Sequence, residues 1–191
     1  LKAKMYDYYD FIVRYENLLY DNVTDITGDA NIWISLGEGA SKTGESGKVL
    51  TIIKSRQDEV IIHIINLIGV NDVWRDTSTP PTIKTSFDFK YYINKSIEGV
   101  YMASPDTDNC RLSSQSYYIG RDEPLGNYVY IQNISRLEYW NMIVIKTGKK
   151  SAASSSSSSF RTYVPWYTAT VDGSVDTGYG VTLASDSENG S

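Results

Sequence analysis

The side chains best suited to chemistry are few in this chain, and they lie far apart. His63 is the only histidine and Cys110 is the only cysteine. A zinc site or a nucleophile–histidine–acid triad needs several such residues together, and neither residue has neighbours of that kind in the sequence. His63 also lies inside the most apolar run, so we interpret it as a hydrogen-bonded histidine of a sheet. We therefore predict no catalytic residue, no metal site and no cofactor in this chain.

Four aspartates in predicted loops are the best candidates for cation binding, because calcium prefers oxygen ligands. They are Asp72, Asp76, Asp106 and Asp108. Their spacing matches no calcium-binding loop, so we interpret them as solvated turn residues. Glycoside hydrolysis would need two carboxylates about 5–10 Å apart on a rigid scaffold. Nothing in the spacing of the acids brings such a pair together.

The four tryptophans could bind sugars, because aromatic faces suit the apolar faces of pyranose rings. Trp140 stands within a predicted strand at residues 137–143, where we expect core packing, and Trp33 falls in a short predicted strand. Trp74 and Trp166 lie in segments that resemble loops. These two are our predicted carbohydrate-binding residues.

The elements that must position these residues are mainly strands. Residues 60–68 are apolar on both faces, which predicts a central strand that is covered on both sides. Residues 85–93 alternate apolar with polar, which predicts one buried and one wet face. Further strands are expected at 31–36, 49–54, 100–103, 112–119, 128–134 and 139–145. About eight strands separated by turn residues favour a mostly β protein, an antiparallel β-sandwich with Greek-key-like connections.

One helix precedes the predicted strands. Apolar residues recur every three or four positions from Met5 to Leu19, and Asp10 and Arg14 stand four apart as an ion pair. The helix is either a cap on the β-domain or the end of a larger fold. In the second case Met5, Tyr9, Ile12, Val13 and Leu19 would have been shaped for an absent neighbour, and the helix would dock weakly on the sandwich.

Composition excludes some partners. There are 16 Tyr and 4 Trp against 4 Phe, and aromatic rings with a polar handle suit half-buried sheets and wet binding surfaces. The net charge is −5 without a basic cluster, so we expect no nucleic-acid or membrane partner. Apolar runs stay far below the ~18 residues of a bilayer span, and no export signal is visible at the start of the chain. Residues 148–159 are serine-rich, either a flexible linker or a poorly determined segment, and residues 160–191 form a tail with possible edge strands.

Several segments together resemble the C-terminal part of glycoside hydrolase family 66, the dextranases and cycloisomaltooligosaccharide glucanotransferases. The resemblance rests on residues 8–19, 65–70, 74–76, 81–82, 91–92, 100–106 and 137–143, which follow in the family's order. It covers about residues 1–147. It implies that residues 1–22 are the terminal helix of an upstream catalytic barrel and that residues 23–147 form the sandwich domain.

The resemblance also implies a function for the parent protein. That family uses a retaining mechanism, with an aspartate nucleophile and a glutamate acid/base on barrel strands that precede this helix. No residue here matches either position, so the chain is expected to be a non-catalytic accessory region of an enzyme acting on α-1,6-glucan. The implied partners are the α-glucan polysaccharide and the upstream barrel, and the implied location is secreted or on a bacterial cell surface. A free-standing carbohydrate-binding or adhesion sandwich and a structural spacer are the alternatives.

Overall fold

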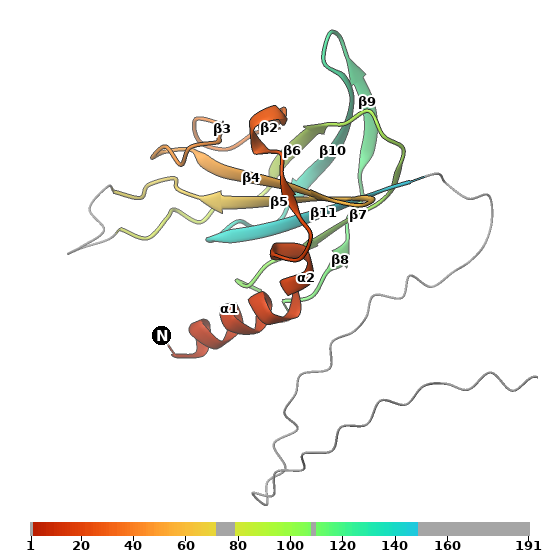
Figure 1. The fold of residues 1–191 in the computed structure, drawn as a ribbon. Coiled ribbons are helices and arrows are strands. Elements are labelled where there is room, and N and C mark those ends of the chain that lie inside the picture. The colour runs from red at the N-terminus through yellow and green to blue at the C-terminus, as the bar shows by residue number, and fades with distance from the viewer. Residues whose placement is uncertain (1, 72–78, 108–109, 149–191) are drawn as a thin grey trace, which may run out of the picture. The chain divides into compact units, whose positions relative to one another are not determined.

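The computed structural model describes residues 2–71, 79–107 and 110–148 (Figure 1). The helices in these ranges are α1 (Lys2–Arg14), α2 (Glu16–Leu19) and the 3₁₀ helix η1 (Thr27–Asp29). The strands are β1 (Thr24–Asp25), β2 (Ile32–Ile34), β3 (Ala40–Ser41), β4 (Val49–Arg56), β5 (Glu59–Asn66), β6 (Phe87–Tyr92), β7 (Ile97–Ala103), β8 (Ser113–Ser114), β9 (Tyr118–Asp122), β10 (Gly126–Ile134) and β11 (Trp140–Thr147).

The strands form two sheets. A seven-stranded sheet has the order β1–β4–β5–β11–β7–β8, with β3 beside β4, and a four-stranded sheet has the order β2–β6–β10–β9. Among the described strands the pairings are antiparallel except for that of β3 with β4. The chain passes back and forth between the sheets, with β2, β6 and β9–β10 in the smaller one. The predicted antiparallel sandwich is confirmed.

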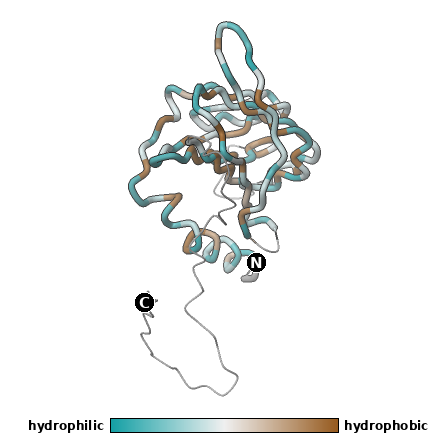
Figure 2. Tube along the Cα trace, turned by 90° about the vertical axis from the view of Figure 1, so that its right-hand side faces the viewer, coloured by the Kyte–Doolittle hydropathy of each residue, from teal (hydrophilic) through white to brown (hydrophobic). Residues whose placement is uncertain are grey.

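One predicted strand is wrong. Residues 112–119 do not form a single strand: β8 pairs with β7 in the seven-stranded sheet, and β9 pairs with β10 in the four-stranded sheet. The apolar content of the segment could not reveal that the chain changes sheets between Ser114 and Tyr118. The hairpin of β9 and β10 then projects from the rest of the sandwich (Figures 1 and 2).

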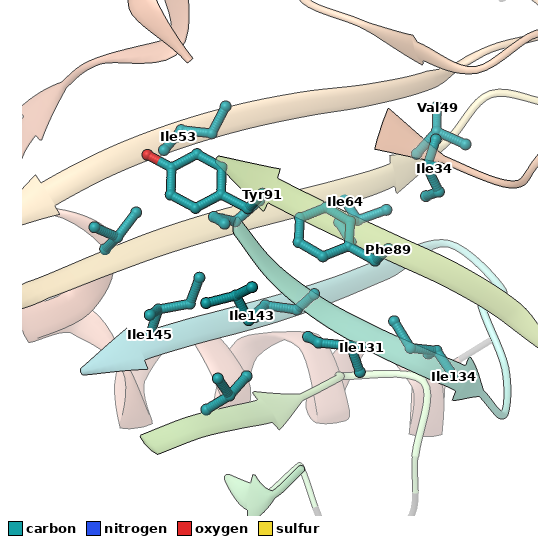
Figure 3. Packing of buried hydrophobic residues seen from close by; sticks show 14 of the residues in the cluster. Ile34, Val49, Ile53, Ile64, Phe89, Tyr91, Ile131, Ile134, Ile143 and Ile145 are labelled. Carbon is teal, nitrogen blue, oxygen red and sulfur yellow. The ribbon is translucent and has the colours of Figure 1, made fainter. Parts of the chain in front are cut away.

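The main core lies between the two sheets. Val60, Ile62 and Ile64 of β5 point inward, and so do Phe87 and Phe89 of β6. Figure 3 shows side chains of both sheets directed toward one another. Alternation along β6 therefore places its odd-numbered residues in the core and its even-numbered residues on the outer face.

A second core lies under the helices, on the outer face of the seven-stranded sheet. Phe11 and Leu18 pack against Ile61 of β5 and against Met142 and Val144 of β11. This is why β5 and β11 read as apolar on both faces. The prediction that residues 60–68 are covered on both sides is confirmed by the buried residues of β5.

Hydrogen bonds add to this helix packing. The Tyr15 hydroxyl donates to the Cys110 carbonyl at 2.8 Å and accepts from the Leu112 amide at 2.7 Å. Lys54 Nζ donates to the Leu19 carbonyl at 2.7 Å. The predicted Asp10–Arg14 ion pair is present at 2.9 Å.

Weak docking of the helix stays a prediction, but the set of residues expected to face an absent neighbour is partly wrong, since Ile12 packs against the second core. Leu19 is buried against the sandwich, and so is Phe11, which the expected stripe omitted. Met5, Tyr9 and Val13 do point away, because the helix carries apolar residues on two faces rather than one. Among the described residues, no helix combines the length and apolarity that a bilayer span requires.

Candidate functional site

The outer face of the four-stranded sheet carries an aromatic surface that we call the tyrosine face. Its members are Trp33 on β2, Lys90 and Tyr92 on β6, Tyr118 on β9, and Tyr128 and Tyr130 on β10. Strand register places Trp33 opposite Lys90, Lys90 opposite Tyr130, and Tyr130 opposite Tyr118, so these side chains form one row across four strands. Tyr92 and Tyr128 stand opposite each other in the next row.

Two carboxylates hold the rings of this face. Asp122 Oδ2 accepts hydrogen bonds from Lys90 Nζ and from the Tyr92 hydroxyl, both at 2.8 Å. Asp88 Oδ2 accepts from the Tyr130 hydroxyl at 2.5 Å, and its other oxygen accepts from the Asn133 amide at 2.9 Å. The irregular pairing of β10 with β6 between Ile131 and Ile134 is where this amide becomes available to Asp88. The rings of Tyr92 and Tyr130 are therefore held in place before any ligand arrives.

The same hydrogen bonds shift the pKa values of their members. Donation by Lys90 and Tyr92 lowers the pKa of Asp122, and donation by Tyr130 and the Asn133 amide lowers that of Asp88. The hydrogen bond to Asp122 raises the pKa of Lys90. All three groups are thus charged at neutral pH, and Lys90 also stands 4.2 Å from the ring centre of Tyr128.

A glycine supports the Tyr128 ring. Gly120 on β9 stands opposite Tyr128, and a Cβ atom built on Gly120 would overlap the ring of that tyrosine. The absence of a side chain at position 120 lets the ring lie against the backbone of β9. Tyr92 meets the same ring edge-on, with ring centres 5.7 Å apart.

Five members of the tyrosine face line a hollow of about 290 Å³: Trp33, Lys90, Tyr92, Tyr128 and Tyr130. This volume is near the lower end of the range for small-molecule sites. Tyr118 lies beyond it in the same row and is 62% exposed, and Trp33 is 47% exposed. The face can therefore offer ring surfaces together with hydrogen-bonding groups to a ligand with hydroxyl groups.

A second hollow, of about 380 Å³, lies where α1 meets the seven-stranded sheet, and its lining includes Tyr8 and Trp140. The Trp140 ring stands edge-on to Phe11 at 4.7 Å, and its Nε1 donates to His63 Nδ1 at 3.3 Å. Burial, with a smaller effect of Lys54, lowers the pKa of His63 to about 4. His63 is thus a neutral, hydrogen-bonded sheet histidine, as its apolar surroundings in the sequence indicate.

Asp106 connects α1 to β11. Its carboxylate accepts from the Tyr8 hydroxyl at 2.6 Å and from the amides of Tyr139 and Trp140, both at 2.9 Å. Asp106 is therefore neither a calcium ligand nor a solvated turn residue, which corrects our interpretation. Burial and the bond to Asp106 raise the pKa of Tyr8. Nearby, Glu138 pairs with Lys4 at 2.6 Å and with Arg136 at 2.7 Å.

The predicted carbohydrate-binding residues Trp74 and Trp166 lie outside the described residues, as do Asp72, Asp76 and Asp108. Within the described ranges no group of three or more His, Cys, Asp and Glu side chains gathers as a metal site would require. Sequence reasoning did not single out the tyrosine face. The available signal was the alternation of Asp88, Lys90 and Tyr92 on the predicted wet face of β6, together with the excess of tyrosine.

Comparisons with known proteins find relatives for most of the described part of the chain. A sequence model of glycosyl hydrolase family 66 matches residues 1–144. A cycloisomaltooligosaccharide glucanotransferase of Niallia circulans is 38% identical in an alignment of 150 residues that covers 76% of this chain and 15% of that protein. A dextranase of Streptococcus salivarius is 32% identical over 163 residues, covering 75% of this chain and 20% of that protein.

A solved structure has a fold similar to that of this chain. A Paenibacillus sp. cycloisomaltooligosaccharide glucanotransferase complexed with cycloisomaltoheptaose matches with a TM-score of 0.67 and 35% identity, over 75% of this chain and 21% of that chain. The chain thus spans about a fifth or less of the length of these relatives. By its sequence and its sandwich, the chain belongs to glycosyl hydrolase family 66.

Proposed function

We propose that this chain is the C-terminal accessory region of a larger enzyme that acts on α-1,6-linked glucan, and that it is not catalytic by itself. The observation that carries the proposal is the family match over residues 1–144, combined with coverage of only 15–20% of the curated relatives. Those relatives are named as a glucanotransferase of cyclic isomaltooligosaccharides and a dextranase. The substrate class comes to this chain from those names.

The acids of the described residues support a non-catalytic role. A glycosidase general acid needs a raised carboxyl pKa. The carboxyls here whose pKa clearly departs from the ordinary value have it lowered, by hydrogen bonds above all: Asp25, Glu45, Asp88, Asp122 and Glu138. Asp106 is occupied by three hydrogen bonds that join α1 to the sandwich. These carboxylates suit positioning rather than proton transfer.

Residues 1–22 are proposed to belong to an upstream catalytic barrel, and residues 23–147 to the sandwich. Support comes from the exposed side of α1, where Met5, Tyr6, Tyr9 and Val13 are 45–71% exposed. A helix that only capped the sandwich would carry polar residues there. An apolar second side suits a contact with another body of protein.

The location follows from the proposed substrate. A polymeric glucan cannot cross a bilayer, so an enzyme acting on it would work outside the cell. We therefore place the parent protein in the secreted or cell-surface fraction. We also propose that residues 148–159 are either a serine-rich linker or a poorly determined segment, and that residues 160–191 are a tail with possible edge strands.

The test compares the 191-residue chain with a form extended upstream to include the barrel. Each is incubated with dextran, and reducing ends and cyclic products are measured by chromatography. The extended form should release products, and the 191-residue chain should match a protein-free blank. Product from the 191-residue chain would contradict the accessory role. An extended form that cleaves another glucan but not dextran would contradict the substrate.

A further inference from the structure

We propose that the tyrosine face is a non-catalytic binding site for a glucan chain. Its rings would pack against the C–H faces of pyranose units, and its charged groups would exchange hydrogen bonds with the sugar hydroxyls. The inference rests on the proposed function only for the linkage of the glucan. The site itself is argued from the geometry of the four-stranded sheet.

The face is preorganised for a ligand. The hydroxyls of Tyr92 and Tyr130 are held by Asp122 and Asp88, at 2.8 and 2.5 Å. Gly120 gives the ring of Tyr128 a backbone surface to lie on. Fixing side chains in advance lowers the entropy cost of binding, which matters most for weak ligands such as sugars.

The charges of the face favour a neutral ligand with many hydroxyls. Lys90 supplies one positive charge, which its contact with Asp122 at 2.8 Å largely neutralises, and Asp88 adds a second carboxylate. A nucleic acid or an anionic lipid needs a basic cluster, and this face has none among the described side chains. Carboxylate oxygens and an ammonium group are the acceptors and the donor that sugar hydroxyls can use.

The arrangement favours an extended ligand. Trp33, Lys90, Tyr130 and Tyr118 form one row across four strands, and three strand spacings of ~4.8 Å give a row about 14 Å long. That length holds more than one sugar ring. The hollow of about 290 Å³ lies within the row and beside Tyr92 and Tyr128. A chain of pyranoses lying across the strands would meet a ring at several points.

The face differs from a protein contact surface in one respect. Its tyrosines place hydroxyl groups at the surface, and two of these are bonded to carboxylates. The exposed side of α1 also has two tyrosines, Tyr6 and Tyr9, but there they stand beside the apolar Met5 and Val13. The more apolar of the two uncovered surfaces is therefore on the helix, and the tyrosine face is the one suited to a hydrated polymer.

The test measures binding of dextran to the 191-residue chain by isothermal titration calorimetry and by affinity gel electrophoresis. Trp33→Ala and Tyr128→Ala are the two site variants. Tyr9→Ala is the matched control, since Tyr9 is an exposed aromatic on α1 with 66% exposure. We expect each site variant to bind dextran about tenfold more weakly and the control to bind as the parent chain does. Thermal midpoints and circular dichroism confirm that each variant is folded.

Three outcomes would overturn the inference. One is an absence of dextran binding at millimolar sugar while the extended form still cleaves dextran; the proposed function would then stand without this site. Another is binding that Trp33→Ala and Tyr128→Ala leave unchanged, which would place the sugar elsewhere. The third is self-association that Trp33→Ala abolishes in sedimentation experiments without any glucan binding, which would make the face an interface between copies. Binding of an α-1,4-glucan in preference to dextran would overturn the assigned linkage.

Discussion

The two sheets of the sandwich differ in what lies on their outer faces. On the seven-stranded sheet, Ile61, Met142 and Val144 face outward and are buried by the side chains of α1 and α2. On the four-stranded sheet, the outward positions carry Lys90, Tyr92, Tyr128 and Tyr130, and no described element covers them. The outer face of the seven-stranded sheet thus forms one side of a second core, and that of the four-stranded sheet is a hydrated aromatic surface.

The two outer faces therefore contribute differently to the stability of the fold. The covered face gains stability from apolar area removed from water, at about 25 cal/mol per Å². The open face gains less, because Tyr92, Tyr128 and Tyr130 are only half-buried and their hydroxyls lie where solvent can compete for hydrogen bonds. Surface aromatic rings that add little stability are the ones that we interpret as binding residues.

The largest expected effect is on the covered face. Phe11 is fully buried, with ring centres 4.7 Å from Trp140 and 4.9 Å from Tyr15. Phe11→Ala should lower the free energy of unfolding by about 3–5 kcal/mol, through lost burial and the cavity left behind. Urea denaturation followed by tryptophan fluorescence measures it. Tyr9→Ala, on the exposed side of α1, should change stability by no more than about 0.5 kcal/mol. Equal midpoints for the two variants would show that the second core does not contribute to global stability.

The next effect depends on pH. Burial holds the pKa of His63 at about 4 in the folded state, against an ordinary value of 6.5. The unfolded chain therefore binds a proton between pH 6.5 and 4 that the folded chain does not. Stability from this group is complete above pH 6.5 and falls as the pH drops toward 4, by about 3 kcal/mol in all. His63→Asn keeps an acceptor for Trp140 Nε1 and does not titrate. Its unfolding free energy should vary less with pH in this window, and identical pH profiles for both proteins would contradict the assignment.

The smallest effects are expected from the same kind of substitution, tyrosine to phenylalanine, made once on each outer face. Tyr15→Phe removes a hydroxyl that bonds to the Cys110 carbonyl and the Leu112 amide beneath the helix, which should cost about 1–3 kcal/mol. Tyr130→Phe removes a hydroxyl bonded to Asp88 on the open face. Solvent can replace that bond, so we expect no measurable change in the thermal midpoint. A larger loss for Tyr130→Phe than for Tyr15→Phe would reverse the assignment of the stabilising face.

The strands were predictable to the extent that local periodicity governs them. Residues 60–65 are apolar except for His63 because β5 has a core on each side, and residues 87–92 alternate because β6 has one wet face. The helix was predictable, but its docking side was not. Phe11 and Tyr15 face the sandwich while Met5 and Tyr9 face away, and both pairs have the four-residue spacing of a helix face. Periodicity alone cannot say which of two apolar sides meets the sandwich.

The tyrosine face could not be predicted because it depends on strand order. Trp33, Lys90, Tyr118 and Tyr130 come from four strands, of which only β9 and β10 are neighbours both in space and in sequence. The sequence favoured tryptophans in predicted loops as binding residues, and these were Trp74 and Trp166, which lie outside the described residues. A prediction of pairing between β2, β6, β10 and β9 would have brought the row together.

Gly120 has a consequence for how such a surface changes during evolution. The height of the Tyr128 ring above the sheet is set by a position that has no side chain of its own. A methyl group at that position would displace the ring while every aromatic residue stayed in the sequence. Two relatives could therefore keep all the tyrosines and still differ in the relief of the surface. In sorting family members by surface shape, residue 120 is as informative as the rings.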